Sequence, residues 1–306
     1  MRQDQIADAL RARPPDPRTS GDCDLMWSVC LAIAARRRAG LPATGFDVGD
    51  TRVRWDSQTG WTPQGDWSEA AYALLDLYRP LLGVLPGERY LIGHLGQSLD
   101  GRIATASGDS CFINGQENLA HMHRLRALCD AVLVGSATVV ADNPQLTTRM
   151  VPGPHACRVV LDPSGRVTPG HRVCADGRSP TLIARRASLS ESRPRDERCG
   201  QAVVIHAAPS PAGLDLPNLL ETLGARGLHC ILVEGGGITV SRFLAQRLLD
   251  RLQIAVAPLI IGSGRQGLQL PEVLALGDCL RPSCRHHRMG PDILWDLDLR
   301  TGSSPA

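Results

Sequence analysis

The sequence predicts an α/β fold in which a largely parallel sheet is covered by helices on both faces. From about residue 89 onward, short continuous apolar runs alternate with segments of helical periodicity. Strands that are buried on both faces of a parallel sheet have this unbroken apolar pattern. The length of 306 residues is comfortable for one large domain of this kind with an appendage.

Residues 1–85 lack this alternation and are expected to form the appendage, to which the sequence assigns no function. Residues 25–38 and 68–82 are typical of helices, and Pro80 is expected to kink or end the second one because proline lacks the backbone N–H. Residues 53–66 indicate a hairpin. Four of the five tryptophans lie in this part, which is more typical of a core or an interface than of a ligand site.

The boundary is expected at Pro86 and Gly87, so that residues 86–306 form the second domain. This domain opens with a strand that leads into a turn at Asp100 and Gly101. Further strands are expected at residues 130–135, 157–162, 181–184, 202–207, 230–235, 251–262 and 293–299. Helices are expected at residues 137–142, 217–227 and 239–250.

A further helix is expected at residues 114–129. Asn114 followed by Glu117 fits a reciprocal capping arrangement at its start. Its predicted apolar face consists of Leu119, Met122, Leu125 and Leu128.

The charge balance gives little support to a nucleic-acid or membrane-surface partner. Net charge is +2, and no long block of one sign occurs. The sequence contains no lysine, so every basic side chain is an arginine. Schiff-base or lysine acid–base chemistry is therefore excluded, and phosphate contacts must come from arginine forks or backbone amides.

The ten cysteines are read as reduced thiols in a cytoplasm. The first 17 residues lack the apolar core of a secretory signal, and no apolar run approaches the length of a membrane span. Cys279 and Cys284, followed by His286 and His287, lack the tight paired spacing of zinc sites. No metal is expected.

The VEGGG motif, Glu234 with Gly235, Gly236 and Gly237, lies where a strand is expected to meet a helix. Ligands bind at such junctions in α/β folds, and helix N-termini attract phosphate. The glycines could therefore cradle a diphosphate. They could equally form a tight turn with close packing, and the spacing leaves both interpretations open.

A second junction has the same design: a strand, then Gly135, Ser136 and Thr138 at the start of a helix. It could contact the other end of a dinucleotide, or Ser136 could simply cap the helix. Two such junctions in one sheet favour a nucleotide more than either does alone. A third glycine motif, IGSGRQG, lacks the helix and the acidic residue of a dinucleotide fingerprint, so we reject that reading and keep the loop as possible lining of a site.

Two polar clusters, ADNPQLTTR and SLDGR, complete the candidate chemistry. Arginine forks match phosphate oxygens, although most clusters of this kind are solvated loops. Five motifs then occur in the order SLDGRIA, HRLRALCDAVLVGSATVVADNPQLTTR, VVLD, ILVEGGGITVSRFL and VAPLIIGSG. Together they resemble the pyrimidine reductase domain of riboflavin biosynthesis, from about Tyr90 to the final strand.

The resemblance implies a dihydrofolate-reductase-like fold, a homodimer, and NADPH as the reductant that converts a ribosylamino group on a phosphorylated pyrimidine to ribitylamino. The cofactor-binding residues that it implies are Gly135, Ser136, Thr138, Asp162, Ser164, Arg166, Gly235, Gly236, Gly237 and Ile238. Ser164 and Arg166 are the candidates for the 2′-phosphate that distinguishes NADPH from NADH.

The resemblance also implies the substrate side. Its substrate-binding residues are Ser98, Asp100, Arg102, Arg126, Leu146, Thr147 and Arg149, and its catalytic candidates are Glu234 and Asp142. Arg149 and Arg126 suit the sugar phosphate, and either acid could orient the substrate or assist protonation. Arg102 stands where the family commonly has lysine, so a fork replaces a point donor.

Three alternatives stay open at this stage. The chain could be a related NADPH reductase of a specialised-metabolite pathway, acting on another pyrimidine or a pterin. It could be dihydrofolate reductase itself, although the DNPQLTTR and SLDGR motifs suit a phosphorylated sugar better. It could be a non-catalytic nucleotide-binding module. The zinc deaminase signature of the bifunctional bacterial enzymes is absent, and both the diamino and the deaminated pyrimidine remain candidate substrates.

Overall fold

A computed structural model describes residues 17–110, 113–187 and 197–300. The chain divides into two compact units, Met1–Pro86 and Gly87–Ala306. The stretch examined for a secretory signal, residues 1–17, lies almost wholly outside the described residues. Among the described residues, no helix is both long enough and apolar enough to cross a membrane.

In the described part of the first unit, residues 17–86, two helices pack with a small antiparallel sheet. Its elements are α2 (Pro17–Arg38), β1 (Phe46–Val48), β2 (Thr51–Asp56), β3 (Gly60–Pro63) and α3 (Glu69–Leu82). The predicted hairpin is present as β2 and β3. The Trp61 indole lies in the core, 4.9 Å from the Trp55 ring, and donates a hydrogen bond to the Leu82 carbonyl.

The first helix of this unit differs from its predicted form, and the second agrees with its predicted bounds. The first begins at Pro17, well before the predicted start at residue 25. The second continues through Pro80 to Leu82. Pro80 does not end it because a proline near the end of a helix removes only one hydrogen bond of the last turn. Ser68 caps its start by accepting a hydrogen bond from the Ala71 N–H.

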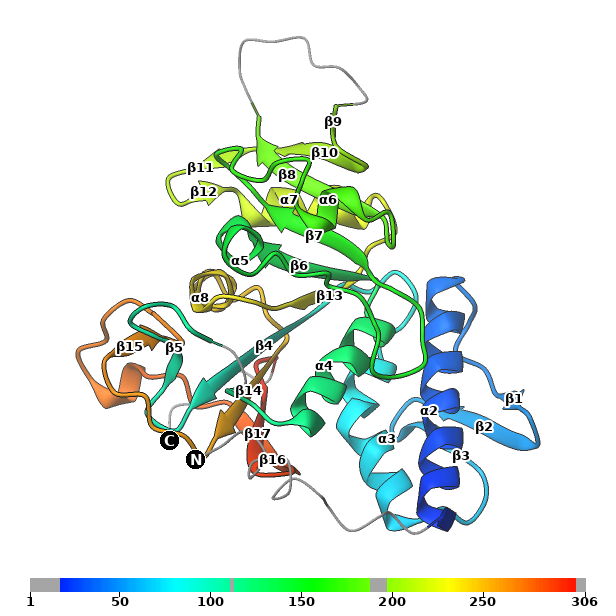
Figure 1. Ribbon diagram of the computed structural model, residues 1–306. Helices are drawn as coiled ribbons and strands as arrows, with labels where there is room; N and C mark the ends of the chain where they lie inside the picture. The colour runs from blue at the N-terminus through cyan, green and yellow to red at the C-terminus, as the bar shows by residue number, and fades with distance from the viewer. Residues whose placement is uncertain (1–16, 111–112, 188–196, 301–306) are drawn as a thin grey trace. The chain divides into compact units, whose positions relative to one another are not determined.

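The second unit is built on one large mixed sheet with the strand order β16-β17-β14-β4-β13-β6-β7-β8-β10-β9 (Figure 1). The strands are β4 (Tyr90–Ser98), β6 (Ala131–Gly135), β7 (Cys157–Leu161), β8 (Thr181–Arg186), β9 (Arg198–Cys199), β10 (Ala202–Ala207), β13 (Cys230–Val233), β14 (Arg251–Ala257), β16 (Ser283–Met289) and β17 (Asp292–Asp298). The strands from β14 to β10 are parallel, and antiparallel strands flank them on both sides. The predicted α/β fold with a mostly parallel sheet is confirmed.

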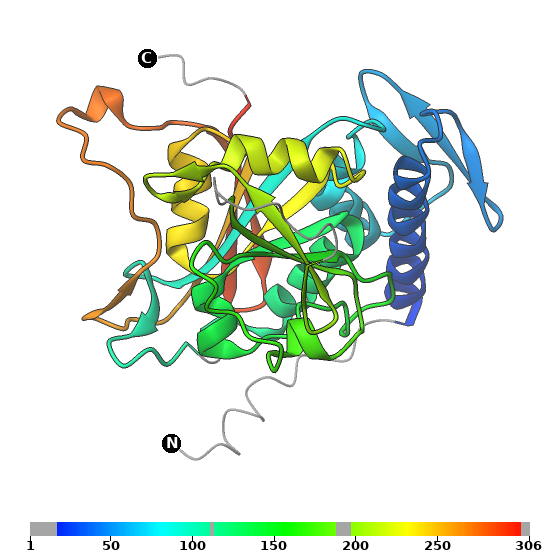
Figure 2. The ribbon, with the colours of Figure 1, turned by 90° about the horizontal axis from the view of Figure 1, so that it is seen from above.

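Helices cover both faces of this sheet, with α7 and α8 on one face and α4 and α5 on the other (Figure 2). Right-handed crossovers require this division, because the chain moves along the sheet in one direction through α4 and α5 and returns through α7 and α8. The helices are α4 (Gln116–Leu128), α5 (Ser136–Asp142), α6 (Arg172–Ala175), α7 (Leu216–Gly224) and α8 (Gly237–Ala245). Shorter elements are β5 (Arg102–Thr105), β11 (Pro209–Ser210), β12 (Gly213–Leu214), β15 (Gly264–Gln266) and η1 (Leu276–Asp278).

Three local predictions were wrong. Gly115, not Asn114, precedes the first turn of α4, and Asn114 instead donates to the Ala255 carbonyl and to Asp292. The predicted strand at residues 251–262 ends at Ala257. Strand β16 was missed because its sequence, SCRHHRM, is polar and mostly exposed, so it carries no apolar run.

The two faces of the sheet are packed by different chemistry. Apolar residues of α7 and α8, such as Leu219 and Phe243, form one continuous core with the sheet. The face of α4 that packs on the sheet is partly polar, whereas an apolar face was predicted. His121 is fully buried there and bonds the Gln253 side chain at 2.8 Å, and His94 of β4 bonds Asn118 at 3.2 Å.

Three buried histidines of this region are held neutral. Burial lowers the pKa of His94 to about 3 and the pKa values of His121 and His123 to about 4. The unfolded chain takes up these protons near pH 6.5. In the folded chain His121 and His123 do so only near pH 4, and His94 only near pH 3. The stability that these groups contribute is therefore present above pH 6.5 and is lost as the pH falls toward 4.

We predict that replacing His121 with glutamine makes stability less dependent on pH. The free energy of unfolding of the wild type should fall between pH 6.5 and 4.5 more steeply than that of the variant, by roughly 1.4 kcal/mol per pH unit. Glutamine keeps an amide near the position of Nε2 but does not titrate. Urea unfolding of both proteins at several pH values in this window measures the difference. Parallel curves would show that His121 is not the titrating group.

Candidate functional site

The two glycine junctions predicted from the sequence lie side by side at one edge of the sheet. Strand β13 pairs in parallel with β6, so their carboxyl ends meet at the same edge. The Gly236 N–H donates a hydrogen bond of 3.1 Å to the Thr138 hydroxyl, which ties the VEGGG turn to the start of α5. A composite site at this edge is the natural place for a ligand.

The glycines of the VEGGG turn are required first by packing. Gly235 has φ +97, and a side chain there would place its Cβ 3.0 Å from the Thr138 hydroxyl. A Cβ on Gly237 would collide with the backbone carbonyl of Gly267. At Gly236 the nearest atom to such a Cβ is the Thr138 hydroxyl, at an ordinary contact distance of 3.6 Å. The first turn of α8 begins here, with Ile238 exposed and with N–H groups that have no intrahelical partner.

Glu234, the residue before these glycines, forms a buried ion pair with Arg126 of α4. Its carboxylate is only 4% exposed, and Oε1 accepts hydrogen bonds from Nη2 at 2.8 Å and Nε at 3.2 Å of Arg126. Oε2 is buried and has no hydrogen-bond partner among the described residues. A buried carboxylate oxygen is costly to leave unpaired, so Oε2 is an acceptor that a bound molecule could satisfy.

The segment from Asp142 to Arg149 has a strained backbone beside this pair. Leu146 is buried with φ +55, a left-handed conformation that a bulky residue adopts at a cost of about 1–3 kcal/mol. Arg126 Nη1 donates to the Thr147 carbonyl at 3.4 Å, so the ion pair and this segment are connected. Strain of this kind persists only where surrounding contacts over-determine the conformation.

Arg149 lies at the exposed end of the same segment. Its Nη1 donates to the Thr147 hydroxyl at 2.9 Å, and its backbone N–H donates to Nδ1 of His123 at 2.9 Å. Partial burial, together with the charges of Arg126 and other arginines, lowers the pKa of Arg149. Crowded guanidinium groups of this kind favour a bound anion.

Asp142, the last residue of α5, lies near a two-stranded ribbon formed by β5 and β15. Partial burial raises the pKa of its carboxyl, and the charge of Arg265 on β15 opposes the shift. The carboxyl therefore holds a proton more readily than an ordinary aspartate. Arg265 was not predicted from the sequence; the rejected IGSGRQG motif is the segment that carries it.

The SLDGR turn is held by hydrogen bonds within it and to the loop at Ile261 and Gly262. Asp100 Oδ1 accepts hydrogen bonds from the Ser98 hydroxyl at 2.6 Å and from the Ile261 N–H, and Oδ2 accepts from the Gly262 N–H at 2.7 Å. These bonds, that of Ser98 above all, lower the pKa of Asp100 to about 2. The Ser98 hydroxyl also accepts from the Arg102 N–H. Arg102 keeps a buried Nε that has no hydrogen-bond partner in the part of the chain that the structure describes.

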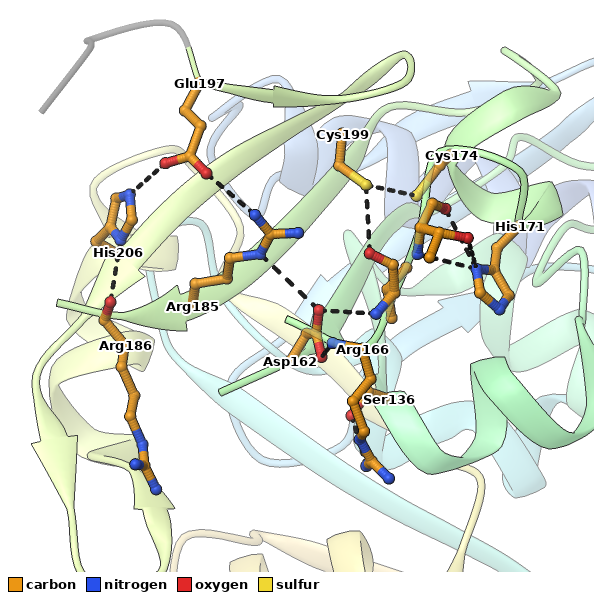
Figure 3. Close-up of polar contacts among 12 residues, drawn as sticks. Ser136, Asp162, Arg166, His171, Cys174, Arg185, Arg186, Glu197, Cys199 and His206 are labelled. Carbon is orange, nitrogen blue, oxygen red and sulfur yellow. Dashed lines mark hydrogen bonds and ion pairs between the residues drawn. The ribbon is translucent and has the colours of Figure 1, made fainter. Parts of the chain in front are cut away.

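A separate group of residues surrounds the end of β7 (Figure 3). Buried Asp162 accepts hydrogen bonds from the N–H groups of Arg166 and Val167 and so shapes the turn that carries exposed Ser164. The Arg166 guanidinium donates to the Ser136 hydroxyl at 2.9 Å. The simple interpretation of Ser136 as a helix cap was wrong, since Gly135 is the N-cap and no side chain caps α5.

Three hydrogen-bonded groups hold part of the predicted site, in addition to the SLDGR turn and Asp142. The pair Glu234–Arg126 joins Thr147 and Arg149 through hydrogen bonds, and Thr138 joins the two glycine turns. Arg166 joins the end of β7 to Ser136. His123 was missed, although its spacing of three residues from Arg126 places both on one side of α4.

Comparisons with known proteins point to one family. The family model described as the RibD C-terminal domain matches residues 89–293. The 2,5-diamino-6-ribosylamino-4(3H)-pyrimidinone 5′-phosphate reductase of Methanothermobacter thermautotrophicus is 35% identical to this chain over 69% of it and 98% of the relative. RibD of Escherichia coli is 34% identical over 69% of this chain and 60% of the relative, so the match spans less than two thirds of that protein.

A solved structure agrees with these sequence relatives. RibD of Acinetobacter baumannii superposes with a TM-score of 0.59 at 25% identity, over 75% of this chain and 63% of that one. The resemblance stated from the five ordered motifs is confirmed by these matches. They lie in the second unit and include both glycine junctions.

We predict that the glycines of the VEGGG turn differ in what they tolerate. Replacing Gly237 with alanine should lower the free energy of unfolding by about 1–3 kcal/mol, because the new methyl group collides with the Gly267 backbone. This loss opposes the usual gain from alanine in a helix. Replacing Gly236 with alanine is the matched control and should change stability by less than about 0.5 kcal/mol. Equal losses in chemical unfolding would contradict the packing argument.

Proposed function

Because this chain belongs to the RibD C-terminal domain family, we propose that it uses NADPH to reduce the ribosylamino group of a phosphorylated aminopyrimidine to ribitylamino. The observation that carries the proposal is the buried Glu234–Arg126 pair, whose free Oε2 lies in the same hydrogen-bonded group as Arg149. Membership of this reductase family implies a nicotinamide cofactor and a small phosphorylated pyrimidine as substrate. NADPH as the specific cofactor belongs to the proposal.

The residues present fit a dinucleotide at the two glycine turns. The first turn of α8 offers N–H groups and a positive helix terminus to a diphosphate, and the contacts of Thr138 and Gly267 hold that turn in place. Gly236 leaves room for a ligand to approach the backbone. Gly135 at the second turn is required by packing instead, because a Cβ there would lie 2.6 Å from the Thr239 hydroxyl.

The preference for NADPH is supported by the residues around the β7 end. Arg166 reaches from there to Ser136 and keeps donors for a phosphate, and Ser164 is exposed on the same turn. Asp162 serves this group indirectly, because both of its oxygens hold the backbone of the turn. A 2′-phosphate at this position would bind the Arg166 guanidinium. NADH has no 2′-phosphate, so this interaction would be lost.

The substrate phosphate is assigned to Arg149, which has the more exposed guanidinium of the site. Thr147 orients that guanidinium, and Arg126 adds positive charge while remaining bound to Glu234. Leu146 lines the segment from within the core. Ser98, Asp100 and Arg102 shape the turn beside the β5–β15 ribbon, with Asp100 acting through the loop that it holds.

The nicotinamide, when bound, supplies a hydride, which we assign to C1′ of the open-chain imine form of the substrate. Arg126 binds Oε1 of Glu234, which leaves Oε2 to accept a hydrogen bond from the substrate and orient it. Asp142 has the raised pKa, which makes it the better residue to hold and deliver a proton. The sequence left open which acid orients the substrate and which assists protonation. We assign orientation to Glu234 and protonation to Asp142.

The partners follow the same proposal. We assign the chain to the cytoplasm and to a homodimer, with no nucleic-acid or membrane partner, consistent with a net charge of only +2. Exposed apolar side chains on the segment around η1, such as Leu274 at 93% and Leu276 at 78%, support an association between copies.

The test of the proposal is an NADPH-oxidation assay with freshly made ribosylamino-pyrimidine phosphates, both the diamino and the deaminated form. At least one should be reduced, with NADPH preferred over NADH by about tenfold or more, as expected for one lost arginine–phosphate interaction. Dihydrofolate is the control and should not be reduced. NADPH binding without turnover on either pyrimidine would support a non-catalytic module, and turnover on a pterin alone would support a specialised pathway.

We predict that replacing Glu234 with glutamine lowers kcat by about 10²–10³-fold while changing the Kd for NADPH by less than about threefold. The amide keeps the size of the side chain but removes the charge that Arg126 balances. Measuring turnover and NADPH binding on the same preparation separates the two effects. Equal, small effects on both would remove Glu234 from the catalytic assignment.

A further inference from the structure

The conformation of the segment from Asp142 to Arg149 has to be held from outside, because Leu146 strains it. Several elements supply the necessary hydrogen bonds. Near its start, the Asn143 side chain accepts from the Arg172 N–H at 2.8 Å, and the Gln145 carbonyl accepts from Arg158 Nη1 at 3.2 Å. Near its end, the Thr148 hydroxyl donates to the Pro154 carbonyl at 2.9 Å. The Arg149 N–H donates to His123 at 2.9 Å. The last of these fixes the backbone of Arg149 itself.

We propose that His123 is a positioning residue for substrate binding: its ring Nδ1 fixes the Arg149 backbone, so that the Arg149 guanidinium meets the substrate phosphate. This inference rests on the proposed function for the identity of the phosphate. The geometry on which it stands is the 2.9 Å hydrogen bond from the Arg149 N–H, together with the burial of His123, which is 5% exposed.

The chemistry of the ring suits this role. Burial, followed by the charges of Arg126 and Arg149, lowers the pKa of His123 to about 4, and the Thr147 carbonyl opposes that shift. At neutral pH the ring is uncharged, and acceptance by Nδ1 requires its proton on Nε2. A protonated ring would point a second donor at the Arg149 N–H and break the bond.

Position distinguishes His123 from the other buried histidine of α4. His121 bonds Gln253 of β14 and supports the contact between helix and sheet. His123 lies two residues later and bonds the backbone of Arg149. Removing either ring therefore costs packing, but only removal of the His123 ring is expected to affect phosphate binding.

The experiment compares His123→Leu, His123→Asn and the matched control His121→Leu by steady-state kinetics. In His123→Leu the KM for the phosphorylated pyrimidine should rise about tenfold, the scale of one lost buried hydrogen bond, with the KM for NADPH changed by less than about twofold. In His123→Asn the side-chain oxygen takes the place of Nδ1, and the KM should return to within about threefold of the wild type. In His121→Leu the ratio of the two KM values should not change.

Asparagine no better than leucine, or a similar rise in both KM values, would overturn the inference. If His123→Leu does not fold, His123→Gln replaces it, because its amide lies near Nε2 and leaves the Arg149 N–H without an acceptor. Calorimetric binding of ribose 5-phosphate separates this inference from the proposed function. Weaker binding in His123→Leu, restored in His123→Asn, supports the inference even if no pyrimidine is reduced; unchanged binding overturns it.

Discussion

The arrangement of the site depends on the burial of one charge. Glu234 directly follows β13 at the centre of the sheet, and its carboxylate is almost completely withdrawn from water. Such a charge is tolerated only with a partner, since an isolated buried carboxylate costs several kcal/mol or more. Arg126 supplies the partner from the last turn of α4. The end of this helix lies near the start of β13, because Asp130, two residues after α4, accepts a hydrogen bond from the Cys230 N–H. The long Arg126 side chain extends from there to Glu234.

Arg126 also connects the ion pair to the loop that follows α5. Arg126 binds the Thr147 carbonyl as well as Glu234, and Arg149 contacts that carbonyl at 3.4 Å from the other side. One backbone oxygen thus connects both guanidinium groups of the proposed phosphate site. The left-handed φ of Leu146 lies in the same stretch, directly before Thr147.

The sequence predicted the elements of this arrangement but not their neighbours. Apolar runs gave the central strands, and glycines marked both junctions. The two junctions are adjacent because β13 inserts between β4 and β6. In this arrangement β13 pairs with β6, which lies about a hundred residues away along the chain. The polar face of α4 was missed because a histidine can be buried only where a hydrogen-bond partner faces it. For His121 this partner is Gln253 of β14, which the sequence of the helix does not reveal. Strand β16 carries no apolar signal at all.

The VEGGG turn shows why the two interpretations of its glycines are compatible. Gly235 and Gly237 allow close contact with Thr138 and Gly267, and that contact fixes the backbone of the turn. A backbone that is already fixed loses little freedom when an anion binds to its N–H groups. Tight packing at two of the glycines therefore improves the phosphate site proposed at the start of α8. Gly236 lies between them and leaves space for a ligand to approach the backbone, but its own N–H is bound to Thr138. The N–H groups that would bind the phosphate therefore belong to the next residues of α8.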